Sequence, residues 1–222
     1  NKIMMTIKLV IFDLDGTLID AYKPVERSIN YTMKQFGFPP VSAETIKRTV
    51  GWGDRHLLQN FIGEKDLDTV LAVYRKHHQT SLKKGSKTIP GAKRVLNYLK
   101  QRGYKIAVAS NRPTAFSDIV IRHLELKEYF DYVLCGDRVH RPKPYPDILK
   151  TIMLKFDICP AECLYVGDMT IDIQTGQRAG VKTVAVITGS STKEELQELK
   201  PYALIKDIRE LIEILEDIHG TG

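Results

Sequence analysis

The stretch IKLVIFDLDGTL, residues 7–18, joins a mostly apolar run to two aspartates and a glycine. The apolar part predicts a buried β-strand. Asp13 and Asp15 follow at once, so one strand end carries two carboxylates. Like charges at such short range repel each other, so either a partner offsets the repulsion or Asp15-Gly16 only closes a tight turn.

Composition limits the class of protein. The chain has 222 residues, of which 43% are hydrophobic and 27% are charged, which predicts a soluble globular protein. No run approaches the roughly 20 apolar residues of a membrane span, and residues 1–8 lack the features of a signal peptide. The three cysteines form no CxxC pair, which argues against a disulfide framework or a zinc knuckle. We therefore expect a cytoplasmic protein without membrane contact.

The formal net charge is +6, but lysines and arginines are spread along the chain. No dense basic run with interleaved aromatic residues is present, so nucleic acid is not expected as a partner. An anionic small substrate accounts for the charge equally well. The sequence leaves open whether the protein is a monomer or a homodimer.

Hydrophobic periodicity predicts two different regions. Residues 20–82 contain four apolar patterns at helical spacing, and the polar stretch KKGSKT at 83–88 has the composition of a linker. From residue 90 on, helical patterns alternate with short apolar strands, at 104–110, 132–135, 163–167, 181–187 and 202–205. This alternation predicts an α/β fold with a Rossmann-like parallel sheet flanked by helices. The first strand joins that sheet, so we expect a core of residues 1–19 and 86–222 and an inserted helical cap of residues 20–85.

Polar side chains follow several of these strands. Because ligands of open parallel sheets bind beyond the carboxyl ends of the strands, we expect these side chains to meet at one edge. Each group taken alone has a simpler explanation: Ser110-Asn111 can cap a helix, and an isolated lysine is usually solvated. The residues at this edge are Asp13, Asp15, Ser110, Asn111, Lys143, Asp168 and Asp172.

Taken together, these residues suit the transfer of a phosphoryl group. Oxygen ligands from two strand ends suit Mg²⁺, which also offsets the repulsion between carboxylates. One carboxylate can attack phosphorus and form an aspartyl-phosphate, while a second moves the proton of the leaving oxygen. A hydroxyl, a backbone N–H and a lysine can stabilise the charge of the transferred group.

The four motifs DLDGTL (13–18), SN (110–111), KP (143–144) and GDMTID (167–172) occur in an order that resembles the haloacid dehalogenase superfamily, in its phosphoglycolate phosphatase-like branch. The resemblance spans nearly the whole chain. It implies a Mg²⁺-dependent phosphatase of a small phosphorylated metabolite. Asp15 argues against a dehalogenase, which lacks the second aspartate, and Gly167-Asp168 differs from the Glu-Asp pair of β-phosphoglucomutases. A phosphosugar mutase and a pyrophosphatase remain the alternatives.

The resemblance also implies roles for individual residues. Asp13 would be the nucleophile, Asp15 the general acid and base, and Lys143 the cation that neutralises nucleophile and phosphate. Ser110 and Asn111 would bind the phosphoryl group. Supporting roles would fall to residues beside these: the metal would be held by Asp13, the backbone carbonyl of Asp15 and Asp168, with Asp172, Gly16 and Thr17 in support.

The cap is expected to select the substrate. Residues 51–55, GWGDR, resemble the glycine-containing cap loop of phosphoglycolate phosphatases, so Trp52, Gly53 and Arg55 are candidate specificity residues. A turn between two helices with a packed tryptophan explains the same stretch. Arg112 follows the SN pair where phosphoglycolate phosphatases commonly carry lysine, so the charge at that position is retained.

Overall fold

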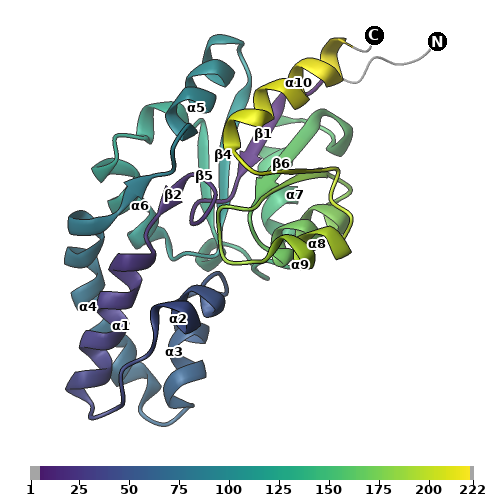
Figure 1. Ribbon diagram of the computed structural model, residues 1–222. Helices are drawn as coiled ribbons and strands as arrows, with labels where there is room; N and C mark the ends of the chain where they lie inside the picture. Colours follow the sequence, from purple (N-terminus) through teal and green to yellow (C-terminus); the bar gives the residue numbers. More distant parts are fainter. Residues whose placement is uncertain (1–5, 221–222) are drawn as a thin grey trace.

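The centre of the molecule is a six-stranded parallel sheet (Figure 1). The computed structural model describes residues 6–220, so five of the eight residues considered for a signal peptide lie outside it. The strand order is β5-β4-β1-β6-β7-β8, and every neighbouring pair is parallel, which confirms the predicted fold class. The strands are β1 (Leu9–Phe12), β4 (Lys105–Ser110), β5 (Tyr132–Cys135), β6 (Cys163–Gly167), β7 (Lys182–Val186) and β8 (Ala203–Ile205).

Helices cover both faces of this sheet, so β1 is apolar throughout. Val10 and Phe12 pack in the same cluster as buried residues of α5 (Ala92–Gln101), α6 (Thr114–His123) and α10 (Leu211–Gly220). Leu9 and Ile11, which point to the other face, pack with α7 (Asp147–Phe156) and the end of α8 (Thr170–Ala179). A strand buried on both faces has no polar side, which explains the continuous apolar run that precedes Asp13.

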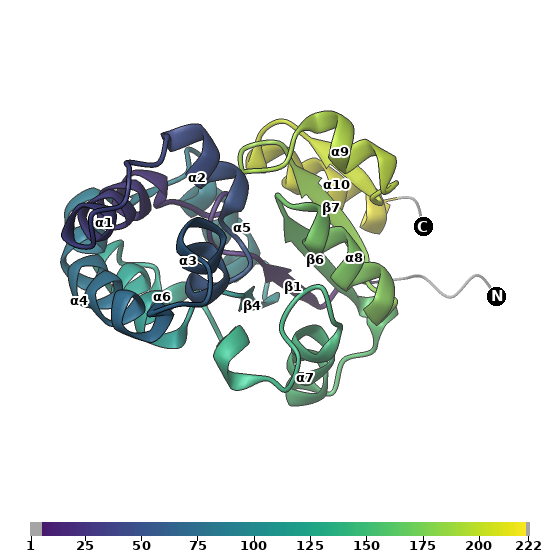
Figure 2. The same cartoon turned by 90° about the horizontal axis from the view of Figure 1, so that it is seen from below.

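The insertion after β1 is helical, as predicted. It contains α1 (Tyr22–Gln35), α2 (Ala43–Thr49), α3 (Asp54–Ile62) and α4 (Leu67–Gly85), and α1 packs along α4. The Ser42 hydroxyl accepts a hydrogen bond from the Thr45 amide at the start of α2, as expected of a helix cap. Figures 1 and 2 show these four helices grouped beside the end of the sheet where α2 and α3 come close to the core.

The structure differs from the sequence-based expectation at the junctions. The predicted linker at 83–88 is wrong for its first half, because α4 continues to Gly85, which packs against Pro24 and Arg27 of α1. Its second half forms β3 (Lys87–Thr88), which pairs antiparallel with β2 (Ile19–Asp20). The predicted boundaries between core and cap fall at this two-stranded ribbon.

Two C-terminal features also differ. A short helix, α9 (Lys193–Glu198), was not predicted, although Thr192 and Glu195 form the capping box that marks its start. The predicted final helix at 207–218 begins as a 3-10 turn (Ile208–Glu210) and continues as α10. Within residues 6–220, no helix has both the length and the apolar character needed to cross a membrane.

Candidate active site

The predicted site residues converge at the carboxyl ends of the three central strands. Asp13 follows β1, Ser110 ends β4 and Asp168 follows β6. Since β1 lies between β4 and β6 in the sheet, these three residues are neighbours in space. The Asp13 amide donates to the carbonyl of Val166 at 2.8 Å, which ties the first strand end to the third.

Lys143 connects two carboxylates in the interior of this edge. Its Nζ lies 2.9 Å from Asp13 Oδ1 and 2.7 Å from Asp172 Oδ1. Only 3% of Lys143 is exposed, so the ion pairs are shielded from water. Burial alone would lower the pKa of Lys143, but the charges of Asp13 and Asp172 outweigh it and raise this pKa. The hydroxyl of Tyr165 donates to Asp172 at 2.7 Å and so helps to fix the second carboxylate.

A buried group of three carboxylates lies beside this lysine. Asp13, Asp168 and Asp172 each offer one oxygen, and these atoms lie within 4.8 Å of one another. Burial raises the pKa of Asp13 to about 7 against the opposing effect of Lys143, and burial with the charge of Asp13 raises that of Asp168. Three acidic groups held this close in the interior are a fitting place for a divalent cation.

Gly16 and Thr17 position Asp168. The Thr17 hydroxyl donates to Asp168 Oδ1 at 2.9 Å. Gly16 has a φ of +81°, and a Cβ at that position would lie 2.5 Å from Asp168 Oδ2. A glycine is therefore required both by the backbone conformation and by the close approach of the carboxylate.

Asp15 points to a different partner from Asp13. Its carboxylate accepts hydrogen bonds from Arg112, with Nε donating to Oδ2 at 2.7 Å and Nη2 donating to Oδ1. Both side chains are largely buried, and both line the same pocket. The two aspartates that the sequence places side by side are thus separated by their partners, one facing Lys143 and the other facing Arg112.

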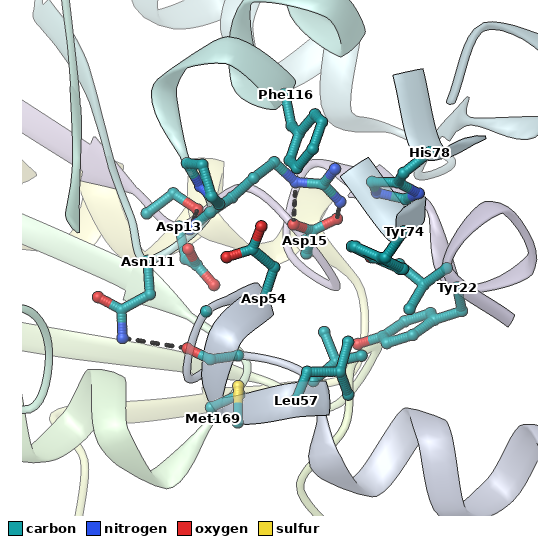
Figure 3. Close-up of a pocket in the computed structure, with 17 residues that line it drawn as sticks. Asp13, Asp15, Tyr22, Asp54, Leu57, Tyr74, His78, Asn111, Phe116 and Met169 are labelled. Carbon is teal, nitrogen blue, oxygen red and sulfur yellow. Dashed lines mark hydrogen bonds and ion pairs between the residues drawn. The ribbon is translucent and has the colours of Figure 1, made fainter. Parts of the chain in front are cut away.

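Ser110 and Asn111 lie at the site but are already engaged. The amide of Arg112 donates to Ser110 Oγ at 3.2 Å. The side-chain amide of Asn111 donates to the carbonyls of Lys143 and Gly51, at 3.0 and 3.1 Å, and accepts from the Lys143 amide. Asn111 therefore holds the loop of Lys143 and joins the core to the cap loop, an interaction that Figure 3 displays.

The predicted cap loop is only partly at the pocket. Gly51 and Gly53 line it, whereas Trp52 and Arg55 are not among its lining residues. Trp52 is 42% exposed and tilts against His56, and exposed Arg55 pairs with Asp68. The structure thus brings Gly53 to the core motifs, while Trp52 and Arg55 face elsewhere.

A pocket between core and cap opens over Asp13 and Asp15 (Figure 3). Asp54 lies across from these two aspartates, and its carboxylate is paired with Arg75 of α4 at 2.7 and 3.1 Å. One side of the pocket is made by rings that pack on one another, with Tyr74 stacked on His78 and His78 edge-on to Phe116. The remaining labelled lining residues in Figure 3 are Tyr22, Leu57 and Met169.

This arrangement agrees with the comparison of the sequence to known families. Residues 10–186 match the family model described as haloacid dehalogenase-like hydrolase. The chain belongs to the haloacid dehalogenase-like hydrolases. The matched segment includes all four sequence motifs and the whole helical insertion between them.

Similar proteins narrow the class of this hydrolase. A phosphoglycolate phosphatase of Aquifex aeolicus is 34% identical over 82% of this chain and 85% of its own length. One of Aliivibrio fischeri is 31% identical over 94% of this chain and 96% of its own. The crystal structure of a predicted phosphoglycolate phosphatase from Haemophilus somnus superposes with a TM-score of 0.90 at 26% identity, covering 94% and 97% of the two chains. This hydrolase is therefore a phosphoglycolate phosphatase-like enzyme that acts on phosphoric monoesters.

Sequence reasoning missed several residues that line the hydrolase pocket. Tyr74 and His78 repeat at a spacing of four in α4, a pattern that indicates a buried helix face but not which cavity that face borders. Asp54 is buried although it begins a helix of the cap, and no sequence pattern marks its partner Arg75. Met169 directly follows Asp168, so its place beside the pocket follows from the motif itself.

Gly189 is a further residue that the motifs do not mark. A Cβ at Gly189 would lie 1.6 Å from Asp168 Oδ2, and the next amide, that of Ser190, donates to this same oxygen at 3.0 Å. We expect Gly189→Ala to displace the Asp168 carboxylate and to lower kcat/KM by about 10²-fold, because small displacements of catalytic groups have effects of that size. Gly220→Ala is the matched control, since a Cβ there meets no atom within 4 Å. Phosphate release with both variants tests this, and wild-type activity of Gly189→Ala would contradict it.

His78 makes the stability of the hydrolase depend on pH. Burial, assisted by the charge of Arg112, lowers the pKa of His78 to about 2, so the folded state keeps it neutral. The unfolded state binds a proton below about pH 6.5, and stability is therefore lost as the pH falls below that value. Between pH 6.5 and 5, wild type should lose about 1.5 kcal/mol more of its unfolding free energy than His78→Gln. Urea unfolding measures this, with exposed His123→Gln as control, and equal slopes for wild type and His78→Gln would contradict it.

Proposed function

We propose that the protein is a cytoplasmic, Mg²⁺-dependent phosphatase of a small phosphorylated carboxylic acid of the phosphoglycolate type, acting through a phosphorylated Asp13. The observation that carries the proposal is the buried contact of Asp13 with Lys143 beside Asp168, at the base of a pocket that Asp15 also lines. The names of the relatives support the substrate class. Three cysteines without disulfide bonds support the cytoplasmic location.

The metal fits the residues present. Asp13 and Asp168 supply hard carboxylate oxygens, with the backbone carbonyl of Asp15 as a third ligand, and the raised pKa values of the two carboxylates indicate a site that lacks positive charge. Bound Mg²⁺ would screen the negative charges of Asp13 and the phosphoryl group from each other. Asp172 is already occupied by Lys143, Tyr165 and the Met169 amide, so its proposed role is to hold Lys143.

In the first step, an Oδ atom of Asp13 attacks phosphorus, the bond from phosphorus to the ester oxygen breaks, and Asp15 gives its proton to that oxygen. In the second step, water attacks the phosphorus of phospho-Asp13, Asp15 takes the proton of the water, and inorganic phosphate leaves. Lys143 stabilises the negative charge of Asp13 and of the phosphoryl oxygens in both steps. Helices α1–α4 act as the cap that encloses the substrate.

Phosphate release from a panel of substrates tests the function. The panel contains 2-phosphoglycolate, sugar phosphates, nucleotides and pyrophosphate, each with Mg²⁺ and with Mg²⁺ removed by a chelator. We expect the highest kcat/KM with 2-phosphoglycolate and no turnover after chelation. A preference for pyrophosphate, or conversion of glucose 1-phosphate into glucose 6-phosphate without phosphate release, would overturn the proposal in favour of a pyrophosphatase or a mutase.

A further inference from the structure

Arg112 has a hydrogen-bond donor without an acceptor at the active site. Its Nε and Nη2 donate to Asp15, whereas Nη1 is buried and finds no hydrogen-bond partner among residues 6–220. Only 8% of Arg112 is exposed. Buried polar atoms are nearly always paired, and an unpaired one costs about 1–3 kcal/mol, so an orphan donor at an active site indicates a missing ligand.

The charges around the pocket favour an anion as that ligand. Among the described residues that line it, Arg112 is the only lysine or arginine. Asp54 is paired with Arg75, which approaches from outside the lining, so Asp54 does not compete for Arg112. A guanidinium is planar and carries five donors, and it can therefore hold Asp15 on one edge while a second carboxylate binds another.

Resting on the proposed function, we propose that Arg112 binds the carboxylate of the substrate through Nη1 and thereby selects phosphorylated 2-hydroxy acids. In such a substrate a single carbon separates the ester oxygen from the carboxylate carbon. Arg112 already holds Asp15, the residue assigned to the ester oxygen, so one guanidinium can position both the proton donor and the group next to the bond that breaks. Arg112 is in this way a specificity residue on the core, outside the predicted cap loop.

The other arginine considered for this task is in a different environment. Arg55 is exposed, pairs with Asp68 and does not line the pocket. A carboxylate bound there would be in contact with water and would gain little, because exposed ion pairs contribute about 0–1 kcal/mol. Arg55 therefore provides the matched control for Arg112.

The test compares 2-phosphoglycolate with its neutral isostere 2-phosphoglycolamide, which has the same leaving oxygen. Steady-state phosphate release is measured for wild type, Arg112→Gln, Arg112→Lys and Arg55→Gln, and the ratio of the two kcat/KM values is compared. Wild type should prefer the carboxylate at least about tenfold, and Arg112→Gln should lower that ratio by about 10- to 100-fold, mainly through KM. Arg112→Lys should fall between them, and Arg55→Gln should keep the wild-type ratio.

Several results would overturn the inference. A wild-type enzyme without preference for the carboxylate would do so even if no Arg112 variant folds. An equal loss of both activities in Arg112→Gln would show that Arg112 acts only through Asp15, and a lowered ratio in Arg55→Gln would place the carboxylate at the cap surface. Failure of wild type to release phosphate from either compound or from any other monoester would instead overturn the proposed function.

Discussion

Replacing Asp13 by asparagine is expected to lower phosphate release from every substrate by at least about 10⁴-fold, because loss of the attacking group removes the covalent route. The variant should still fold, since asparagine has nearly the same shape. Burial raises the pKa of Asp13 to about 7, so the neutral amide replaces a carboxylate that is already costly to ionise. The substitution also leaves Lys143 paired with Asp172.

Two measurements make this expectation specific to a nucleophile. Rapid-quench mass spectrometry should detect a phosphoryl group on the wild-type chain and none on Asp13→Asn. Thermal unfolding checks that the variant is folded, and Asp118→Asn, which changes an exposed carboxylate of α6, is the matched control. A variant that retains activity within tenfold of wild type would contradict the role of Asp13.

The second large effect is expected on stability. Lys143→Met should lower the free energy of unfolding by about 3–5 kcal/mol, because it leaves the Asp13 and Asp172 carboxylates buried without their cation. Adding Asp172→Asn to Lys143→Met removes one of the two stranded charges and should recover part of the loss. Activity should fall in both variants, since the lysine also stabilises the phosphoryl group.

Urea unfolding in the absence of divalent ions measures this effect. Lys150→Met is the matched control, because Lys150 is an exposed residue of α7 and its loss should change stability by no more than about 0.5 kcal/mol. A loss below about 1 kcal/mol in Lys143→Met would mean that water or relaxation of the site compensates the two carboxylates.

Most of the core could be predicted from local signals. Strands such as Lys105–Ser110 and Cys163–Gly167 are short apolar runs between amphipathic helices, a pattern set by burial on both faces of the sheet. The two-residue strands β2 and β3 and the end of α4 were missed because they depend on contacts between distant segments. Gly85 looks like a helix breaker in the sequence, but packing against α1 keeps it helical.

The candidate site shows the same division. The topology rule brings Asp13, Ser110 and Asp168 to one edge without any knowledge of side-chain directions. The partner of each group is not encoded locally: Asn111 was expected at the phosphoryl group, yet its side chain binds the carbonyls of Gly51 and Lys143. Gly189 has no motif around it, and only the folded chain brings it against Asp168.

The sequence by itself determined the class of chemistry, because that depends on residue types at strand ends: two aspartates after β1, a lysine and a further aspartate. Only the tertiary structure decided which charge neutralises which. Residues 13 and 15 are two apart in the chain, but Asp13 meets Lys143 and Asp15 meets Arg112. Hydrogen bonds and ion pairs act over a few ångströms, so these partnerships exist only once distant segments pack together, and with them the unpaired nitrogen of Arg112.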